Sequence, residues 1–166
     1  HGLMQVLCEK VEVPDKASSA TNNNARYVAT DGTMMLIVDT DQPAPEASYT
    51  IQADVLNVYV QSKGHAPAPT EVNSVTSWNA FPEYKLVIPS RPCADSSGKP
   101  IERIGFNPVF IEQVETVRRA LKLERNAAWS CRFDGPTGPT IWEPASLTGV
   151  EGITDVMLII MPMRLD

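Results

Sequence analysis

The chain has 166 residues, of which 43% are hydrophobic and 20% are charged, and its net charge is −6. This size and balance suit one domain, or two small closely packed ones, with a real apolar core. The negative charge argues against a protein coated in basic surface for nucleic acid, although it leaves room for a local basic face. No apolar run is long enough to span a membrane, so we expect no membrane partner.

The three cysteines, Cys8, Cys93 and Cys131, are widely spaced and form no CxxC pair. Only His1 and His65 could join them, and this set does not make a zinc site. We therefore expect no metal and no cofactor. Reduced, partly buried thiols are typical of a cytoplasmic protein.

A β-hairpin is the clearest feature of the first half. Asp31-Gly32 separates two β-prone runs, 26–30 and 33–40, and both residues tolerate a positive φ. Asp54 and Gly64 are placed to begin and end a short helix over 54–63. The other predictions for this half are strands at 3–13, 48–52, 71–78 and 84–89, and loops at 14–25 and 42–47.

The second half follows a polar segment, 90–100, whose composition predicts a linker between modules 1–89 and 101–166. A helix over about 108–124 is the strongest prediction there. Asn107 is a good N-cap and Pro108 a good first helical residue, and apolar residues recur behind them at helical spacing. Strands are predicted at 102–106, 129–135, 136–142 and 156–160.

Each predicted helix follows a strand and precedes further strands, which indicates a repeated βαβββ-type module. Neither half can bury its apolar faces alone, so we expect one compact body. The fold class is therefore α+β, with antiparallel sheets and two helices on one face.

No arrangement of residues points to catalysis. His65 is the only internal histidine and lies in a segment rich in proline and glycine, which favours a solvated loop residue. A nucleophile system would rest on that residue alone, and no glycine-rich phosphate loop is present. We expect a protein that is not an enzyme.

Four cations gather toward the end of the 108–124 helix: Arg118, Arg119, Lys122 and Arg125. Together they could contact DNA phosphates. The alternative is local, because basic residues offset the dipole at a helix C-terminus and Glu115 is placed to pair with Arg118 or Arg119. The sequence leaves both interpretations open.

Four fragments, read together, resemble the bacterial β sliding clamp, the processivity ring of the replicative DNA polymerase. They are an "ATDG" hairpin, an "FP-x-Y-x-x-V-x-P" segment, an "FN-x-x-(Y/F)-(L/I)" helix start and a terminal "MPMRL". Here they occupy 29–32, 81–89, 106–111 and 161–165, in the order that the family has. The resemblance implies a DNA-clamp fold and a short clamp-like protein of a phage or mobile element.

The resemblance also implies two binding surfaces. One is a hydrophobic pocket for the clamp-binding peptides of replication proteins, and the other is a basic inner face for duplex DNA. The pocket positions are Thr30, Gly32, Met35, Pro89, Met161, Pro162, Met163, Arg164 and Leu165, and the DNA positions are Arg118, Arg119, Lys122, Arg125 and Lys63.

This chain differs from the family in length and at the pocket rim. A clamp subunit has three such domains, whereas this chain holds about one, so a ring would need several copies in a homo-oligomer. Thr33-Met34 stand where the family usually has His-Arg, which removes a cation from the rim. Residues 161–165 are thus either a pocket wall, with soft methionines beside Pro162, or only core filling.

Two functions follow from the sequence. The first is a clamp-like replication protein that binds clamp-binding peptides, DNA, or both. The alternative is a structural or assembly protein that reuses the clamp fold without a nucleic-acid role, because a fold does not fix a function.

Overall fold

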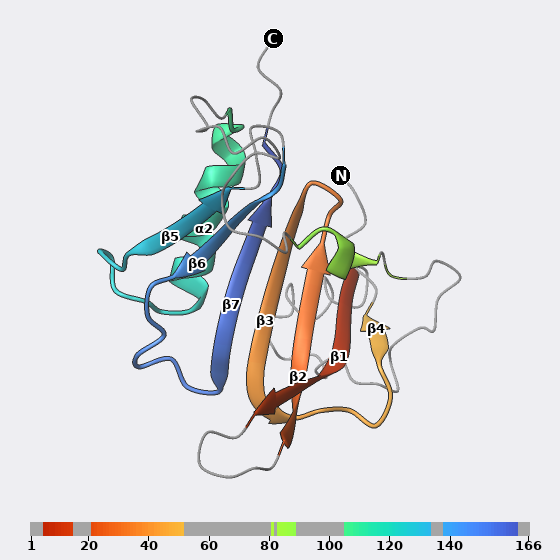
Figure 1. Cartoon of the computed structure of the whole chain (residues 1–166). Helices are drawn as coiled ribbons and strands as arrows, with labels where there is room; N and C mark the ends of the chain where they lie inside the picture. Colours follow the sequence, from red (N-terminus) through yellow and green to blue (C-terminus); the bar gives the residue numbers. More distant parts are fainter. Residues whose placement is uncertain are drawn as a thin grey trace, which may run out of the picture.

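In the part of the chain that the structure describes, seven antiparallel strands form one sheet in the order β4-β1-β2-β3-β7-β6-β5 (Figure 1). The computed structural model describes residues 5–14, 21–51, 81, 83–88, 105–133 and 138–162. The strands are β1 (Gln5–Pro14), β2 (Thr21–Thr30), β3 (Met34–Pro43), β4 (Tyr49–Ile51), β5 (Trp129–Phe133), β6 (Thr140–Pro144) and β7 (Ile153–Ile160). The pairing of β3 with β7 joins strands from both predicted modules, 1–89 and 101–166, in this sheet.

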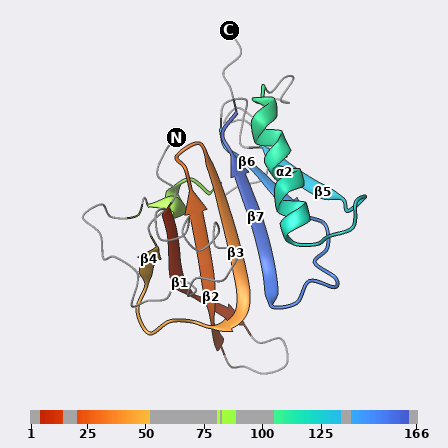
Figure 2. The same cartoon turned by 180° about the vertical axis from the view of Figure 1, so that it is seen from behind.

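The two faces of the sheet carry different helical elements. The helix α2 (Pro108–Ala120) lies on one face, beside β5, β6 and β7, and the 3₁₀ turn η2 (Tyr84–Leu86) lies on the opposite face near β1 and β2 (Figures 1 and 2). Because side chains alternate along a strand, β3 serves both faces. Met35 and Ile37 join Tyr84 in a buried cluster, whereas Leu36 and Val38 face a cleft beside α2.

The predicted hairpin at Asp31-Gly32 is confirmed, with a turn that extends to Thr33. The Asp31 Oδ1 atom accepts hydrogen bonds from the backbone N–H groups of Thr33, at 2.8 Å, and Met34, at 2.9 Å. Gly32 has a φ of +88°, a left-handed conformation that glycine adopts at little cost. Asp31 itself does not have a positive φ, so one glycine and one carboxylate hold the turn.

The predicted N-terminus of α2 is confirmed, but its predicted end is wrong. Asn107 Oδ1 accepts a hydrogen bond of 3.1 Å from the Val109 N–H, and Pro108 is the first helical residue. The helix ends at Ala120 rather than at 124. Lys122 turns to a φ of +55°, and the chain then leaves the helix axis and buries Leu123, which is 8% exposed.

Two further predictions are wrong. The loop predicted over 14–25 includes the start of β2, because 21–25 pair with residues 10–14 of β1 and a ladder of backbone hydrogen bonds outweighs polar composition. The strand predicted over 84–89 is the turn η2, because Tyr84 goes into the core and the next residues fold back over it. The strands predicted at 3–13, 48–52 and 156–160 correspond to β1, β4 and β7, although β7 begins earlier.

The observed class is α+β, with an antiparallel sheet and, in the part of the chain that the structure describes, one α-helix. The helix predicted at 54–63 and the linker predicted at 90–100 lie outside the described residues. None of the helices in the described part is long and apolar enough to cross a membrane.

Candidate functional site

A pocket of about 240 Å³ lies where the β2–β3 hairpin meets the end of β7. Four of the residues predicted for a peptide-binding pocket line it: Thr30, Gly32, Met35 and Met161. The other lining residues are Thr33, Met34, Val87 and Ile159. The fold thus brings residues of the "ATDG" hairpin together with Met161, the first residue of "MPMRL".

Hydrogen bonds hold the walls of this pocket in place. The Thr30 hydroxyl donates to the Met34 carbonyl at 2.8 Å and accepts from the Gly32 N–H at 3.1 Å. The Met161 N–H donates to the Thr33 carbonyl at 3.3 Å, which ties the residue after β7 to the hairpin. These hydrogen bonds fix the hairpin and the residue after β7 to each other at the pocket.

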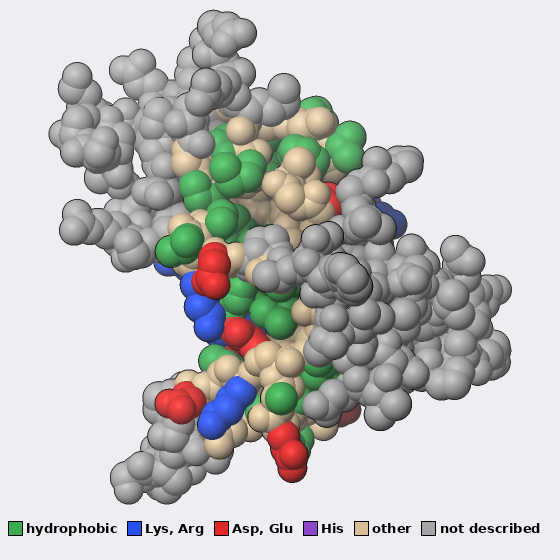
Figure 3. Space-filling view, turned by 90° about the vertical axis from the view of Figure 1, so that its right-hand side faces the viewer, with side chains coloured by type: hydrophobic (Ala, Val, Ile, Leu, Met, Phe, Trp, Pro, Cys, Tyr) green, Lys and Arg blue, Asp and Glu red, His purple; other side chains and the backbone are tan. Residues whose placement is uncertain are grey.

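The pocket has a buried floor and an apolar rim. On the floor, Met35 is 6% exposed and Ile159 is 1% exposed. On the rim, Met161 is 39% exposed and Val87 is 37% exposed. Figure 3 shows hydrophobic side chains gathered at the upper end of the molecule, the end at which the β2–β3 hairpin lies in Figure 1. Large apolar side chains left open beside a hollow are typical of a recognition surface.

Sequence reasoning missed Val87 and Ile159. Val87 lies two residues before the predicted Pro89. Ile159 lies two residues before Met161, so the alternation of side chains along a strand could have identified Ile159. Pro162 is described but does not line the pocket. Pro89, Met163, Arg164 and Leu165 lie outside the described residues.

A second, larger cleft of about 450 Å³ lies on the other face of the sheet, between α2 and strands β2, β3 and β7. Its lining is mostly apolar and includes Leu36, Val38, Val117 and Leu158. Thr30, Met34 and Met35 line both hollows, so the two meet at the hairpin.

The predicted DNA-binding cations do not form one stripe on a helix. Arg118 donates from Nε and Nη2 to Glu115, at 2.6 and 3.0 Å, and from Nη1 to the Leu123 carbonyl. Arg119 also donates to Glu115, at 2.7 Å, although its side chain is 73% exposed. These hydrogen bonds, first from Arg118 and then from Arg119, lower the pKa of Glu115 to about 2. The two arginines therefore make the local contacts that the alternative interpretation predicts.

The remaining predicted cations lie elsewhere. Lys122 and Arg125 are exposed and follow the last turn of α2, and Lys63 is outside the described residues. The side chain of Arg118 is only 14% exposed. The four cations that the sequence spaces along one helix therefore do not form one exposed basic face.

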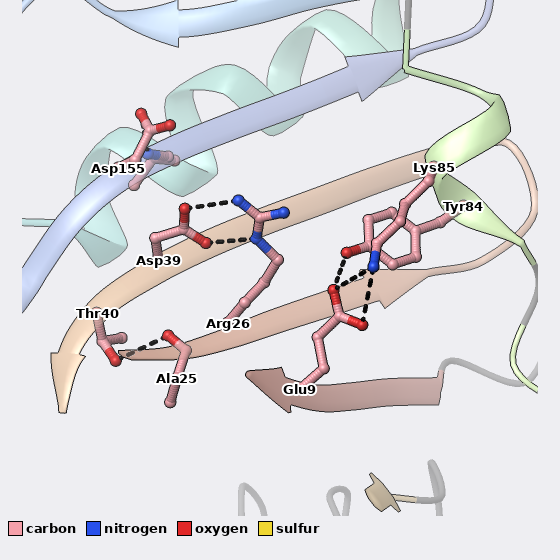
Figure 4. Close-up of polar contacts among 9 residues, drawn as sticks. Glu9, Ala25, Arg26, Asp39, Thr40, Tyr84, Lys85 and Asp155 are labelled. Carbon is pink, nitrogen blue, oxygen red and sulfur yellow. Dashed lines mark hydrogen bonds and ion pairs between the residues drawn. The ribbon is translucent and has the colours of Figure 1, made fainter. Parts of the chain in front are cut away.

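A row of paired polar groups crosses the face of the sheet that carries η2 (Figure 4). Arg26 and Asp39 form a two-point ion pair with N–O distances of 2.6 and 2.8 Å. The Tyr84 hydroxyl donates to the Glu9 carboxylate, and the Lys85 ammonium lies 3.4 Å from the same group. Burial, and then the hydrogen bond to Glu9, raise the pKa of Tyr84 to about 12.

Asp155 stands at the end of this row, directly opposite Asp39 in the β3–β7 register. Burial raises its pKa, and the nearby negative charges of Asp39 and Glu143 act in the same direction. The described residues contain no group of three or more potential metal ligands. The row joins neighbouring strands to each other and to η2.

No protein-family model, no curated protein and no solved structure matches this chain. The function is therefore argued from the motifs in the sequence and the geometry of the pocket.

Proposed function

We propose that this chain is a non-enzymatic, sliding-clamp-like protein of DNA replication that binds the clamp-binding peptide motifs of replication proteins. The observation that carries this proposal is the shared pocket of Thr30, Gly32, Met35 and Met161. Thr30 and Gly32 belong to the "ATDG" motif, Met35 follows it, and Met161 begins "MPMRL" far away in the sequence. The resemblance alone implies that these positions line a peptide pocket. In this proposal the chain has the repeated modules and the helix pair of a clamp domain.

The chemistry of the pocket suits a short peptide with apolar anchors. Its volume of about 240 Å³ lies below the roughly 300–1,000 Å³ typical of sites for whole small ligands, so it fits a few side chains of a longer partner. Three methionines, Met34, Met35 and Met161, give it a polarizable and adaptable lining. Thr33 and Met34 both line the pocket at the positions where the family usually has His-Arg. The rim therefore favours an apolar side chain of the peptide over an acidic one.

DNA binding is the weaker part of the proposal. It would depend on Arg119, Lys122 and Arg125, because the guanidinium of Arg118 is already engaged by Glu115 and Leu123. A homo-oligomer would be needed to close a ring. The alternative, a structural or assembly protein with the same fold, predicts no affinity for the peptide.

Fluorescence anisotropy with a labelled peptide of the Gln-Leu-x-Leu-Phe type tests the proposal. We expect saturable binding that Met161→Asp weakens by at least about tenfold, because a carboxylate at the rim must lose water when the peptide covers it. Val109→Asp is the matched control, since Val109 is also an exposed apolar residue, at 57%, but lies on α2 outside the pocket. Absence of binding at millimolar protein, or equal effects of the two variants, would refute the proposal.

A further inference from the structure

The segment formed by η2 and Val87 supplies one wall of the pocket through Val87, but η2 has little structure of its own. It has three residues, and the residue that follows it, Val87, forms the exposed rim. Leu86 beside it is 85% exposed and gives the turn no anchor. What holds Val87 over the pocket must therefore lie elsewhere in the turn.

Tyr84 is that anchor. It is 3% exposed and belongs to the same buried cluster as Met35 and Ile159, the two residues of the pocket floor. Phe81 packs edge-on against its ring, with the ring centroids 6.3 Å apart. The Tyr84 carbonyl accepts a 3.0 Å hydrogen bond from the Val87 N–H, so Tyr84 contacts the rim through its backbone and shares a buried cluster with the floor.

Glu9 on β1 holds the other end of Tyr84. Its carboxylate accepts the hydrogen bond of the Tyr84 hydroxyl and pairs with Lys85, whose ammonium also lies 5.6 Å from the centre of the Tyr84 ring (Figure 4). The Glu9 side chain is only 14% exposed, and a carboxylate so covered needs such partners. A phenylalanine at 84 would fill the core equally well, so core packing alone does not account for the hydroxyl.

We propose that Tyr84, held by Glu9, is a positioning residue for the pocket, and that this contact fixes η2 so that Val87 closes the rim over Met35 and Ile159. The inference rests on the proposed peptide-binding function. According to this inference, Glu9 on β1, which does not line the pocket, determines how well the pocket is formed before the peptide binds. A preformed rim raises affinity because less ordering is left for the binding step.

The test compares Tyr84→Phe with Thr40→Val in the full chain. Each variant removes one hydroxyl that hydrogen-bonds inside the protein. Thr40 donates to the Ala25 carbonyl at 3.0 Å and lies near the end of β3 that is far from the hairpin. We expect Tyr84→Phe to weaken peptide binding about fivefold, which is the size of one lost hydrogen bond, and Thr40→Val to leave it unchanged. Glu9→Gln, which keeps an acceptor, should retain affinity, and Glu9→Ala should lose it as Tyr84→Phe does.

Amide hydrogen exchange separates this inference from the proposed function. The Val87 N–H should exchange faster in Tyr84→Phe than in the wild type, and at the wild-type rate in Thr40→Val. If the wild type binds no peptide, the proposed function fails, and faster exchange of Val87 still supports the positioning role. Unchanged exchange of Val87, or equal effects of Tyr84→Phe and Thr40→Val on affinity, would overturn the inference.

Discussion

We expect the two partners of the Arg26–Asp39 ion pair to lose unequal amounts of stability when each is substituted. Asp39 is buried, with 7% exposure, and faces Asp155 across the β3–β7 pair. Arg26→Gln leaves these two carboxylates opposite each other without the cation that pairs with Asp39. Asp39→Asn leaves the Arg26 charge with Asp155, one strand beyond position 39, as a more distant carboxylate that replaces part of the lost partner. We therefore expect Arg26→Gln to cost more stability than Asp39→Asn.

The expected losses in the free energy of unfolding follow from how exposed the two side chains are. Removing one partner of a fully buried ion pair costs about 3–5 kcal/mol. The side chains here are 22% and 10% exposed, so we place Arg26→Gln near the lower end, at about 3 kcal/mol. For Asp39→Asn we expect about 1.5–2 kcal/mol, because Arg26 keeps some water and a nearby carboxylate. Like charges in directly opposite strand positions cost up to about 1 kcal/mol, and Asp155→Asn should remove that part of the Arg26→Gln penalty.

Urea unfolding at pH 7, followed by circular dichroism, measures these differences. Arg132→Gln is the matched control, because its partner Glu143 is at 2.6 Å but the two side chains are more exposed, at 44% and 25%. It should cost less than about 1 kcal/mol. Equal losses for Arg26→Gln and Asp39→Asn, or no relief of the Arg26→Gln loss by Asp155→Asn, would refute the reasoning.

Three further outcomes follow from the contacts of single residues. Burial, and then the hydrogen bond to Glu9, raise the pKa of Tyr84 to about 12, so the protonated Tyr84 should stabilise the fold fully below pH 10. This contribution should be lost as the pH rises from 10 through 12, and thermal unfolding of Tyr84→Phe should lack this alkaline step. Because the pKa of Glu115 falls from 4.5 to about 2, its pairing with Arg118 should stabilise α2 above pH 4.5, and this stabilisation should be lost as the pH falls toward 2. The helical ellipticity of Glu115→Gln should not change between these pH values. Lys122→Gly should raise the free energy of unfolding by about 0.5–1 kcal/mol in urea titrations, since glycine adopts the φ of +55° more readily than lysine. A loss of stability in this variant would contradict this account of the helix end.

Features set by local chemistry could be predicted from the sequence. Asp31 and Gly32 make the hairpin because one carboxylate bonds the turn and one residue lacks a Cβ. Asn107 begins α2 because its side chain caps the helix without help from the rest of the fold. These signals lie within a few residues of the structure that they specify.

Features set by distant partners could not be predicted in this way. The polar start of β2 is a strand only because β1 pairs with it, from Pro14 opposite Thr21 onward. Tyr84 lies in a turn and not in a strand because its ring is buried in a cluster with residues from distant strands.

The pocket was predicted only in part for the same reason. The resemblance identified residues on the hairpin and at the chain end, but Val87 joins them through η2, whose position depends on the Tyr84–Glu9 contact.

The most direct test of the central claim is to locate the bound peptide on the protein. Titration of the labelled protein with the Gln-Leu-x-Leu-Phe peptide, followed by methyl NMR, should shift the signals of Met35, Val87, Ile159 and Met161 and leave that of Val109 in place. Shifts confined to Val109 or other residues outside the pocket, or none at all, would contradict the account.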